Sequence, residues 1–590
     1  MSKTISGTYA SGITLTSIAD NPTTITALGR VNAGLYISNP AAWQVVNQGS
    51  IHSGSGGKGI TLSSGGTLTN QTAGGIYGIA MGIYGGTGGA LTVVNAGKIS
   101  ASAGIYLRSG GVVTNQSTGT ISGSDAIISY ANTTVVNAGR LLGGSTNGLG
   151  IDFFNGGGSV TNQSTGTISG GSAIYGQTGG ALTVVNAGQI AGITTSSNGM
   201  GVFLQAGGIV TNQAGGTISG YDAIVGANFG AATVSNAGTI TGTRNALKFG
   251  TQQDNRLIVS AGAKFTGTVN GGNLPGAVNI STLELTSSAS TGTLTGLGAQ
   301  FVNFGSIKLD TGAHWFLEGG TAGLTGTIAG FAAGDTIKVD GITATGSSFS
   351  AGVLTLNVGG GTVGVNVPGN FTTGNFTVTN VAGGTNITVA CFREGTLIGT
   401  PAGDVAVEAL RPGDHVTTVI DGPSAPIVWV GHRTLDCTRH PRPEQVWPIR
   451  VAAGAFADGV PARDLFLSPD HAIYVEGALI PAKHLVNGTS VAQIPVNRVT
   501  YYHVELAEHD VILAEGLPAE SYLDSANRGM FAHGGGSLIL HPDMSPAVGR
   551  PLNAPGLPVV PAPAVTTGSG TTGAGTHPAA KWPVRSAARG

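Results

Sequence analysis

The sequence predicts an all-β protein with a right-handed parallel β-helix at its N-terminal side, then a compact β-rich domain, then a disordered tail. Three observations predict this order. A short phrase of Val, Ile, Thr and Asn recurs through the first 250 residues, charged residues concentrate after residue 390, and the end is rich in Gly, Pro, Ala and Thr. The predicted parts are residues 1–250 (β-helix), 251–390 (its β-rich continuation or cap), 391–525 (compact domain) and 526–590 (flexible tail).

The composition excludes several classes of function. The 590 residues include 102 Gly but only 26 Lys and Arg and 28 Asp and Glu, so the formal net charge is −2. Without a strong basic field, nucleic-acid binding is not expected. No apolar run approaches the ~18 residues of a membrane span, and residues 1–12 lack the apolar core of a secretory signal. Any export is therefore expected to use a route without an N-terminal signal peptide, after a cytoplasmic stage.

The recurring phrase, VVNAG or VTNQS, places an Asn every 20 to 26 residues, a spacing typical of solenoid coils. Alternating Val, Ile and Thr between Gly, Asn and Ser turns predict short strands. Stacked coils of about 24 residues would bury the apolar side chains and align the asparagines at a turn, and nine coils at a spacing of ~4.8 Å would extend about 45 Å. The aligned residues are Asn47, Asn70, Asn95, Asn115, Asn137, Asn162, Asn186, Asn212 and Asn236.

Residues 251–390 keep the pattern of strands and turns but lose the phrase. A β-helix without a cap would expose strand edges, which folded proteins normally cover. This segment is therefore predicted to continue or cap the β-helix. Its aromatic side chains suit either a cap or an ordinary core, and they are Phe301, Phe304, Trp315, Phe316 and Phe331.

The repeats do not predict a polysaccharide-cleaving enzyme. Glycoside hydrolysis requires two carboxylates about 5 to 9.5 Å apart. Residues 45–250 contain only Asp125, Asp152 and Asp222, and the first and last occupy equivalent places four coils apart, which is about 19 Å. The expected role of the β-helix is structural or adhesive, with a glycan or cell-surface partner.

Residues 391–525 carry the reactive chemistry. They hold 26 of the charged residues, both cysteines and seven of the twelve histidines. The segment reads CFREGTLIGTPAGDVAVEALRPGDHV from Cys391, RDLFLSPDHAIYV from Arg463 and VTYYHVELAEHDVILAEG from Val499. These three stretches, in this order, resemble the Hint (hedgehog/intein) domain in the bacterial form found at the C-terminal side of secreted or surface-type proteins. The resemblance therefore implies a secreted or cell-surface protein. The SPDH sequence is similar to the Thr-x-x-His block of that family, with Ser in place of Thr.

The resemblance implies self-processing, and the chemistry of the residues agrees with it. A cysteine can attack the carbonyl just before it, which would convert the Ala390–Cys391 amide into a thioester. The leaving nitrogen must be protonated while the oxyanion is stabilised. His471 is the candidate proton donor, and Ser468 is the candidate hydroxyl that orients the scissile peptide. His503, near the place where inteins often carry Asp, and His509 are candidates for the second step.

The end of the domain departs from the intein pattern. Inteins finish with His-Asn, whereas residues 517–522 read LPAESY and the next Asn is Asn527. Full splicing is therefore not expected. The thioester would instead be cleaved by an external nucleophile, which is water, an amine, a hydroxyl or a thiol. The predicted activity is single-turnover, cysteine-dependent autoproteolysis without a cofactor.

Three alternatives remain open at this stage. The chain would be a non-enzymatic β-helical adhesin if its Hint module were inactive. A disulfide between Cys391 and Cys437 would block the attacking thiolate. Cys437 with His432 and His440 lacks the paired Cys/His spacing of zinc modules, so no metal site is predicted.

Overall fold

The computed structural model describes residues 2–521 except 55, 288–290, 311–312, 333–334, 370, 372–375, 389–390, 421, 440–442 and 508–509. Three predictions therefore lie outside the described residues: the cleavage-site residue Ala390, the candidate His509 and the tail 526–590. The chain forms two compact units, one of residues 1–285 with 296–307, the other of residues 286–295 with 308–590. The boundary between these two compact units falls near residue 308.

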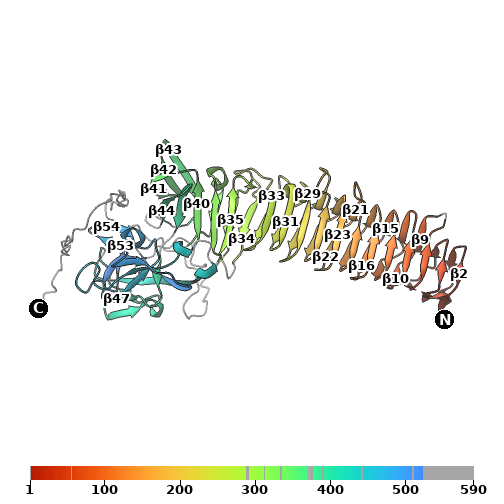
Figure 1. Ribbon diagram of the computed structural model, residues 1–590, viewed down its shortest axis with the longest axis horizontal. Coiled ribbons are helices and arrows are strands. Elements are labelled where there is room, and N and C mark those ends of the chain that lie inside the picture. The colour runs from red at the N-terminus through yellow and green to blue at the C-terminus, as the bar shows by residue number, and fades with distance from the viewer. Residues whose placement is uncertain are drawn as a thin grey trace, which may run out of the picture. The chain divides into compact units, whose positions relative to one another are not determined.

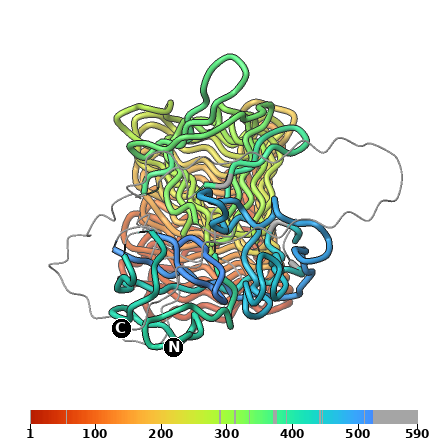
Figure 2. The backbone as a smooth tube through the Cα atoms, turned by 90° about the vertical axis from the view of Figure 1, so that its left-hand side faces the viewer, coloured from red at the N-terminus to blue at the C-terminus, as the bar shows by residue number. Residues whose placement is uncertain are grey.

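The first unit contains an N-terminal β-solenoid, which confirms the predicted fold class. The solenoid has about 14 turns, and its strands lie side by side along the red-to-yellow part of the chain in Figure 1. A typical turn contributes β13 (Leu91–Asn95) to one sheet and β14 (Lys98–Ser100) and β15 (Ala103–Leu107) to another. Each strand pairs in parallel with the equivalent strand of the next turn. Figure 2, viewed from the end, shows the turns lying over one another.

The remaining strands of this unit follow the same scheme. The first sheet contains β1 (Lys3–Ile5), β4 (Thr23–Ile25), β7 (Trp43–Asn47), β10 (Gly66–Asn70), β16 (Gly111–Asn115), β19 (Thr133–Asn137), β22 (Gly158–Asn162), β25 (Leu182–Asn186), β28 (Gly208–Asn212), β30 (Ala232–Asn236), β32 (Arg256–Val259) and β34 (Thr282–Leu285). The second contains β2 (Thr8–Tyr9), β3 (Ile13–Leu15), β5 (Arg30–Val31), β6 (Leu35–Ile37), β8 (Ser50–His52), β9 (Lys58–Leu62), β11 (Gly75–Tyr77), β12 (Met81–Gly85), β17 (Thr120–Ser122), β18 (Asp125–Ser129), β20 (Arg140–Leu142), β21 (Leu149–Phe153), β23 (Thr167–Gly170), β24 (Ser172–Gly176), β26 (Gln189–Gly192), β27 (Met200–Leu204), β29 (Thr217–Gly226), β31 (Thr239–Lys248), β33 (Lys264–Asn270) and β36 (Phe301–Val302). One 3-10 helix, η1 (Ile18–Asp20), interrupts the early turns.

The predicted asparagine ladder is present. All nine asparagines are buried, and the side-chain amide of each of the first eight donates to the Oδ1 atom of the next at 2.8 to 2.9 Å. The same amides also contact carbonyl groups of the adjoining turns, as Asn95 Nδ2 does with Gly97 O at 3.1 Å. The ladder satisfies buried polar groups that would otherwise destabilise the corner of the solenoid.

The solenoid extends beyond the ladder at both ends, so the predicted count of nine coils was too small. In the register of the asparagines, Ile5 and Ile25 precede Asn47, and Val259 and Leu285 follow Asn236. In these turns a buried apolar side chain takes the place of the asparagine. The recurring sequence with its Asn is therefore absent there, although the coils continue.

The second unit begins with a β-rich segment in which antiparallel pairs join parallel ones such as β38 (Trp315–Gly319) with β40 (Thr336–Asp340). Strands β41, β42 and β43 form one antiparallel ribbon, and β40, β45 and β44 form another. The five aromatic residues proposed for a cap or core are all buried. The elements are β38 (Trp315–Gly319), η2 (Thr321–Leu324), β39 (Thr327–Ala329), β40 (Thr336–Asp340), β41 (Ala344–Ser350), β42 (Val353–Val358), β43 (Gly361–Asn366), β44 (Thr377–Val381) and β45 (Gly384–Thr388), with β35 (Gly292–Leu297) and β37 (Ser306–Leu309) where the chain passes between units.

Two further sheets form the region after residue 390. One has the order β49 (His415–Val416), β50 (Ala425–Asp436), β56 (Arg498–Leu506), β46 (Phe392–Arg393), β52 (Leu465–Leu467), β51 (Ile449–Val451), β55 (Val491–Gln493). The other has the order β48 (Gly403–Ala406), β47 (Leu397–Thr400), β57 (Val511–Ala514), β58 (Leu517–Glu520), β53 (Ala472–Val475), β54 (Ala478–Pro481). Short 3-10 helices connect them: η4 (Val407–Ala409), η5 (Cys437–Arg439), η6 (Pro443–Gln445) and η7 (Ala482–Leu485).

The short strand β46 is central to this region. Phe392 pairs with Tyr502 of β56 on one side and with Leu467 of β52 on the other, and its side chain lies in the apolar core. The residue before it, Cys391, is thereby held between two strands. Among the described residues, no helix has the length and apolar character needed to cross a membrane.

Candidate functional site

Cys391 is fixed by two backbone hydrogen bonds to one residue. Its N–H donates to Ser468 Oγ at 2.7 Å, and the N–H of Ser468 donates to the carbonyl of Cys391 at 2.9 Å. The Cys391 nitrogen belongs to the Ala390–Cys391 peptide bond, so the hydroxyl of Ser468 lies directly against the nitrogen that cleavage would release. Both side chains are buried.

The sulfur of Cys391 contacts an imidazole. Its Sγ lies 2.8 Å from His503 Nε2, on β56, and both residues are at most 3% exposed. Burial raises the pKa of the Cys391 thiol well above its usual range. Burial, together with the nearby His471 and Arg433, lowers the pKa of His503 to about 3. The resting pair is therefore a neutral thiol in hydrogen-bond contact with a neutral imidazole.

His471 belongs to the same turn as Ser468. The N–H of His471 donates to the carbonyl of Ser468 at 3.1 Å, and the N–H of Ala482 donates to the carbonyl of His471 at 2.9 Å. The ring packs against Phe392 with centroids 4.1 Å apart. The structure thus brings four of the predicted residues together: Cys391 and His503 at the sulfur, Ser468 at the scissile nitrogen, and His471 next to them.

A salt bridge that the sequence did not predict ties this turn to the strand leading into the site. Lys483 Nζ lies 2.5 Å from Asp470 Oδ1 and 2.5 Å from Thr379 Oγ1 of β44. Thr388, at the end of β45, donates through Oγ1 to Asp470 Oδ2. Asp470 was visible within SPDH, but no local pattern pointed to Lys483.

A buried arginine also lies near the sulfur. Arg433 of β50 donates from Nε to His314 Nε2 at 3.0 Å and from Nη2 to Ala313 O, and its Nη2 is 3.9 Å from Asp335 Oδ1. Its positive charge partly opposes the effect of burial on the pKa of Cys391. The sequence held one indication that Arg433 is buried. Side chains of β50 alternate between buried and more exposed positions, and Arg433 is in step with the buried Ile427, Trp429 and Leu435.

Glu520 is a second buried acid that sequence reasoning did not assign to the site. Its Oε1 accepts the N–H of Ala472, the residue after His471, at 2.9 Å. Burial, with a smaller contribution from the nearby Asp470, raises the pKa of Glu520 to about 8. Glu520 is therefore mostly protonated at neutral pH, and it anchors the strand that follows the SPDH turn.

The open alternatives can be compared with this geometry. Cys391 and Cys437 are both free thiols, so the hypothesised disulfide is not formed in the structure. His432 stacks on Tyr502 with ring centroids 5.1 Å apart. Within the described parts of the chain, no three His, Cys, Asp or Glu residues are grouped so that they could hold a metal ion.

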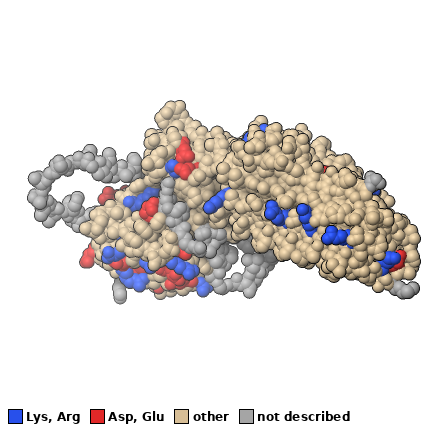
Figure 3. All heavy atoms as spheres, turned by 45° about the vertical axis from the view of Figure 1, so that its right-hand side comes forward, with Lys and Arg blue, Asp and Glu red and all other residues tan. Residues whose placement is uncertain are grey.

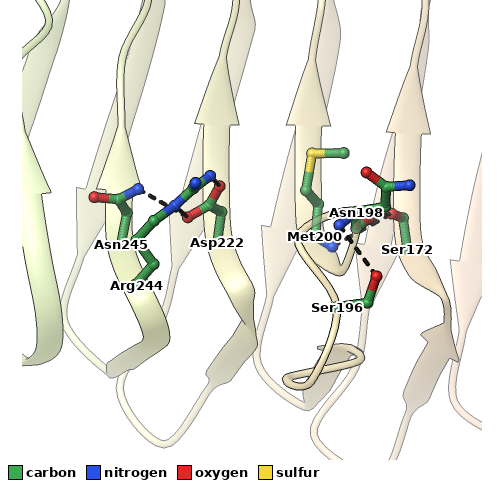
Figure 4. Close-up of polar contacts among 7 residues, drawn as sticks. All are labelled: Ser172, Ser196, Asn198, Met200, Asp222, Arg244 and Asn245. Carbon is green, nitrogen blue, oxygen red and sulfur yellow. Dashed lines mark hydrogen bonds and ion pairs between the residues drawn. The ribbon is translucent and has the colours of Figure 1, made fainter.

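The acidic residues of the solenoid hold neighbouring coils together. Asp222 faces Arg244 and Asn245 in Figure 4, with distances of 3.0 Å to Arg244 Nε and 2.8 Å to Asn245 Nδ2. Asp125 accepts the N–H of Leu149 at 2.8 Å, and Asp152 accepts from Gln177 Nε2 at 3.0 Å. Each of these carboxylates therefore has a structural hydrogen bond to the next coil.

The fold and the site together define a β-solenoid protein with a β-rich domain that starts at a buried cysteine. The family model described as the Hint domain matches residues 390–526, which is less than half of the chain. The chain thus carries a Hint domain after its N-terminal β-solenoid. No curated protein matches it.

Proposed function

We propose that the Hint domain cleaves its own chain once, between Ala390 and Cys391, through an N-to-S acyl shift. The observation that supports this most strongly is the double contact of Cys391, whose sulfur lies 2.8 Å from His503 Nε2 and whose nitrogen lies 2.7 Å from Ser468 Oγ. Cys391 thus has the imidazole of His503 next to its attacking sulfur and the hydroxyl of Ser468 next to the nitrogen that would leave.

In the first step, Cys391 Sγ forms a bond to the carbonyl carbon of Ala390 while its proton passes to His503 Nε2. The thiol is a weak acid and the imidazole a weak base here, since burial shifts both pKa values toward the neutral forms. A resting thiolate is therefore disfavoured, and proton transfer accompanies the attack. A positioned base of this kind contributes roughly 10²- to 10⁴-fold to the rate.

In the second step, the bond between the Ala390 carbonyl carbon and the Cys391 nitrogen breaks, and the nitrogen takes up a proton. Ser468 Oγ accepts from this nitrogen at rest. It can donate to the same atom once the tetrahedral intermediate gives the nitrogen a lone pair. His471, as the imidazolium, is the proposed source of this proton and ends the step as a neutral imidazole; it shares the turn of Ser468 and lies close enough to affect the pKa of His503.

The resulting thioester would react with water, an amine, a hydroxyl or a thiol. This reaction releases residues 1–390 or joins them to the nucleophile. Splicing is not proposed, because residues 517–522 read LPAESY and offer no Asn to cyclise. The freed or conjugated solenoid would then act outside the cell or at its surface, as an adhesive element.

The test is intact-mass analysis of the full chain after incubation with hydroxylamine or dithiothreitol. We expect a fragment that ends at Ala390, as the hydroxamate in hydroxylamine, and its loss in Cys391→Ala. Cys437→Ala is the matched control, because it removes the other buried thiol, and it should cleave like the parent chain.

Two outcomes would contradict the proposal. One is full-length protein that stays unchanged with every nucleophile, which would favour the non-enzymatic adhesin. The other is equal cleavage in Cys391→Ala, which would assign the chemistry to a different residue.

A further inference from the structure

One face of the solenoid carries a column of basic side chains. Parallel pairing in the second sheet aligns the first residues of a set of strands from turn to turn. These strands are β5, β8, β11, β14, β17, β20, β23, β26, β29, β31 and β33. We call this set the basic column. Its members are Arg30, Ser50, Gly75, Lys98, Thr120, Arg140, Thr167, Gln189, Thr217, Thr239 and Lys264.

The four cations of the column are available to a ligand. Arg30, Lys98, Arg140 and Lys264 are all exposed, and no ion pair between described residues involves them. The column contains no acid. Figure 3 shows basic side chains spaced along the solenoid, with acidic ones nearly absent between them.

The adjacent column, two residues further along each strand, contains neither acidic residues nor Lys or Arg. It presents hydroxyl groups in most turns, and from β8 to β33 it consists of His52, Tyr77, Ser100, Ser122, Leu142, Ser169, Ala191, Ser219, Thr241 and Thr266. The buried side chains between the two columns, such as Ile99 and Ile121, belong to the solenoid core. The face therefore offers positive charge together with rows of hydrogen-bonding groups.

The solenoid fixes the distances between the charges. Adjacent parallel strands lie ~4.8 Å apart, so Arg30, Lys98, Arg140 and Lys264, at turns separated by three, two and five steps, are about 14, 10 and 24 Å apart along the axis. Because each turn is hydrogen-bonded to the next, this line of charges is rigid. A ligand that engages all four must be long, roughly straight and anionic at intervals.

We propose that the basic column binds a linear acidic polysaccharide along the solenoid axis. The carboxylate or sulfate groups of the polymer would pair with the four cations, and its hydroxyl groups would hydrogen-bond to the Ser, Thr and Gln side chains between them. This binding does not depend on cleavage at Ala390.

The spacing favours a polysaccharide over a nucleic acid. Duplex DNA carries one charge per ~1.7 Å of its axis, whereas the column supplies four cations over about 48 Å. Single-stranded nucleic acids are usually held by exposed aromatic platforms, and this face has only Tyr77 and His52, whose rings stack on each other with centroids 4.7 Å apart. Widely spaced charge with many hydroxyl partners matches a polymer of sugar acids better.

The experiment measures binding of the full chain to polygalacturonate by isothermal titration calorimetry at low and high salt, with dextran and oligo-dT as comparison ligands. We expect binding to polygalacturonate that weakens steeply with salt, and little binding to dextran. The variant Lys98→Glu with Arg140→Glu should weaken binding by about tenfold or more, since two of the four contacts would become repulsive.

The matched control is Lys58→Glu with Lys248→Glu, which makes the same charge change in the same unit. Lys58 lies over the Tyr84 ring and Lys248 ends β31, so neither belongs to the column. Both variants are first compared with the parent by thermal unfolding. Three results would each overturn the proposal. These are equal weakening by the two variants, no binding to polygalacturonate at low salt, and tighter binding to oligo-dT than to polygalacturonate.

Discussion

A thiol that is buried against a neutral imidazole is a poor nucleophile at rest. For Cys391, burial disfavours the thiolate, and for His503 it disfavours the imidazolium, so an ion pair between them is not populated. The proposed reaction therefore depends on close placement of the Ala390 carbonyl rather than on a preformed thiolate. Once the chain has folded, the same burial shields the thiol from alkylation and oxidation.

His503→Gln tests the role of the imidazole as a base. Glutamine keeps a polar group next to the sulfur but cannot take its proton at neutral pH, so we expect cleavage in hydroxylamine to slow by about 10²-fold or more. The rate is followed by the appearance of the fragment ending at Ala390. His415→Gln, which changes an exposed imidazole of the same domain, should leave the rate unchanged. A parental rate in His503→Gln would remove His503 from the mechanism.

Several of the residues predicted for the site lie close together in the structure, but their arrangement differs from the predicted one. Cys391 and Ser468 were predicted to meet at the scissile peptide, and the hydrogen bond between them agrees with this. His503 was assigned to the second step, yet it lies at the sulfur. Its position depends on the pairing of β56 with β46 and β50, a long-range register that one sequence does not reveal.

At the scale of the element, each turn of the solenoid depends on close backbone approach at its corners. Gly111 begins β16 with a φ of +140°, a conformation that side chains rarely adopt. A Cβ atom at this position would lie 2.0 Å from the carbonyl oxygen of Leu91, in the preceding turn. The glycine is thus required by both the backbone conformation and the distance between turns.

Gly111→Ala should destabilise the turn that contains β16. The added methyl group must displace the backbone of β13, so we expect a loss of about 2 kcal/mol or more. A lower thermal midpoint by circular dichroism and new protease sites near residue 111 would show it. Gly7→Ala is the matched control, because a Cβ atom there meets nothing within 4 Å. Equal midpoints for Gly111→Ala and the parent would show that the turns separate easily.

The solenoid turns that could be predicted from the sequence are those that carry the recurring asparagine. The asparagines of the ladder made nine turns visible because an amide that must pair with its neighbours cannot be replaced by an ordinary residue. The turns with Ile5, Ile25, Val259 or Leu285 at that position bury an apolar side chain instead, which many residues can provide. The antiparallel ribbons after residue 340 carry no repeat, and their pairing was not predicted.

At the scale of the whole molecule, three buried groups make stability depend on pH in opposite directions. His503 has a folded pKa of about 3, below its unfolded value of about 6.5, so it stabilises the fold above pH 6.5 and this contribution is lost as the pH falls. Asp335 and Glu520 have folded pKa values raised to about 7 and about 8. Their contributions are fully present below about pH 4 and are lost as the pH rises.

Between pH 7 and 8, Glu520 contributes most of the change in stability, because His503 is largely neutral in both states and Asp335, with a folded pKa of about 7, is already at least half ionised. We expect the free energy of unfolding of the uncleaved second unit, measured by urea denaturation, to fall by about 1 kcal/mol over this pH unit. Glu520→Gln keeps an acceptor for the N–H of Ala472 but does not ionise, so it should remove most of this fall. Asp335→Asn should instead flatten the profile below pH 7 and keep the fall above it. The same fall in Glu520→Gln as in the parent would contradict a neutral, buried Glu520.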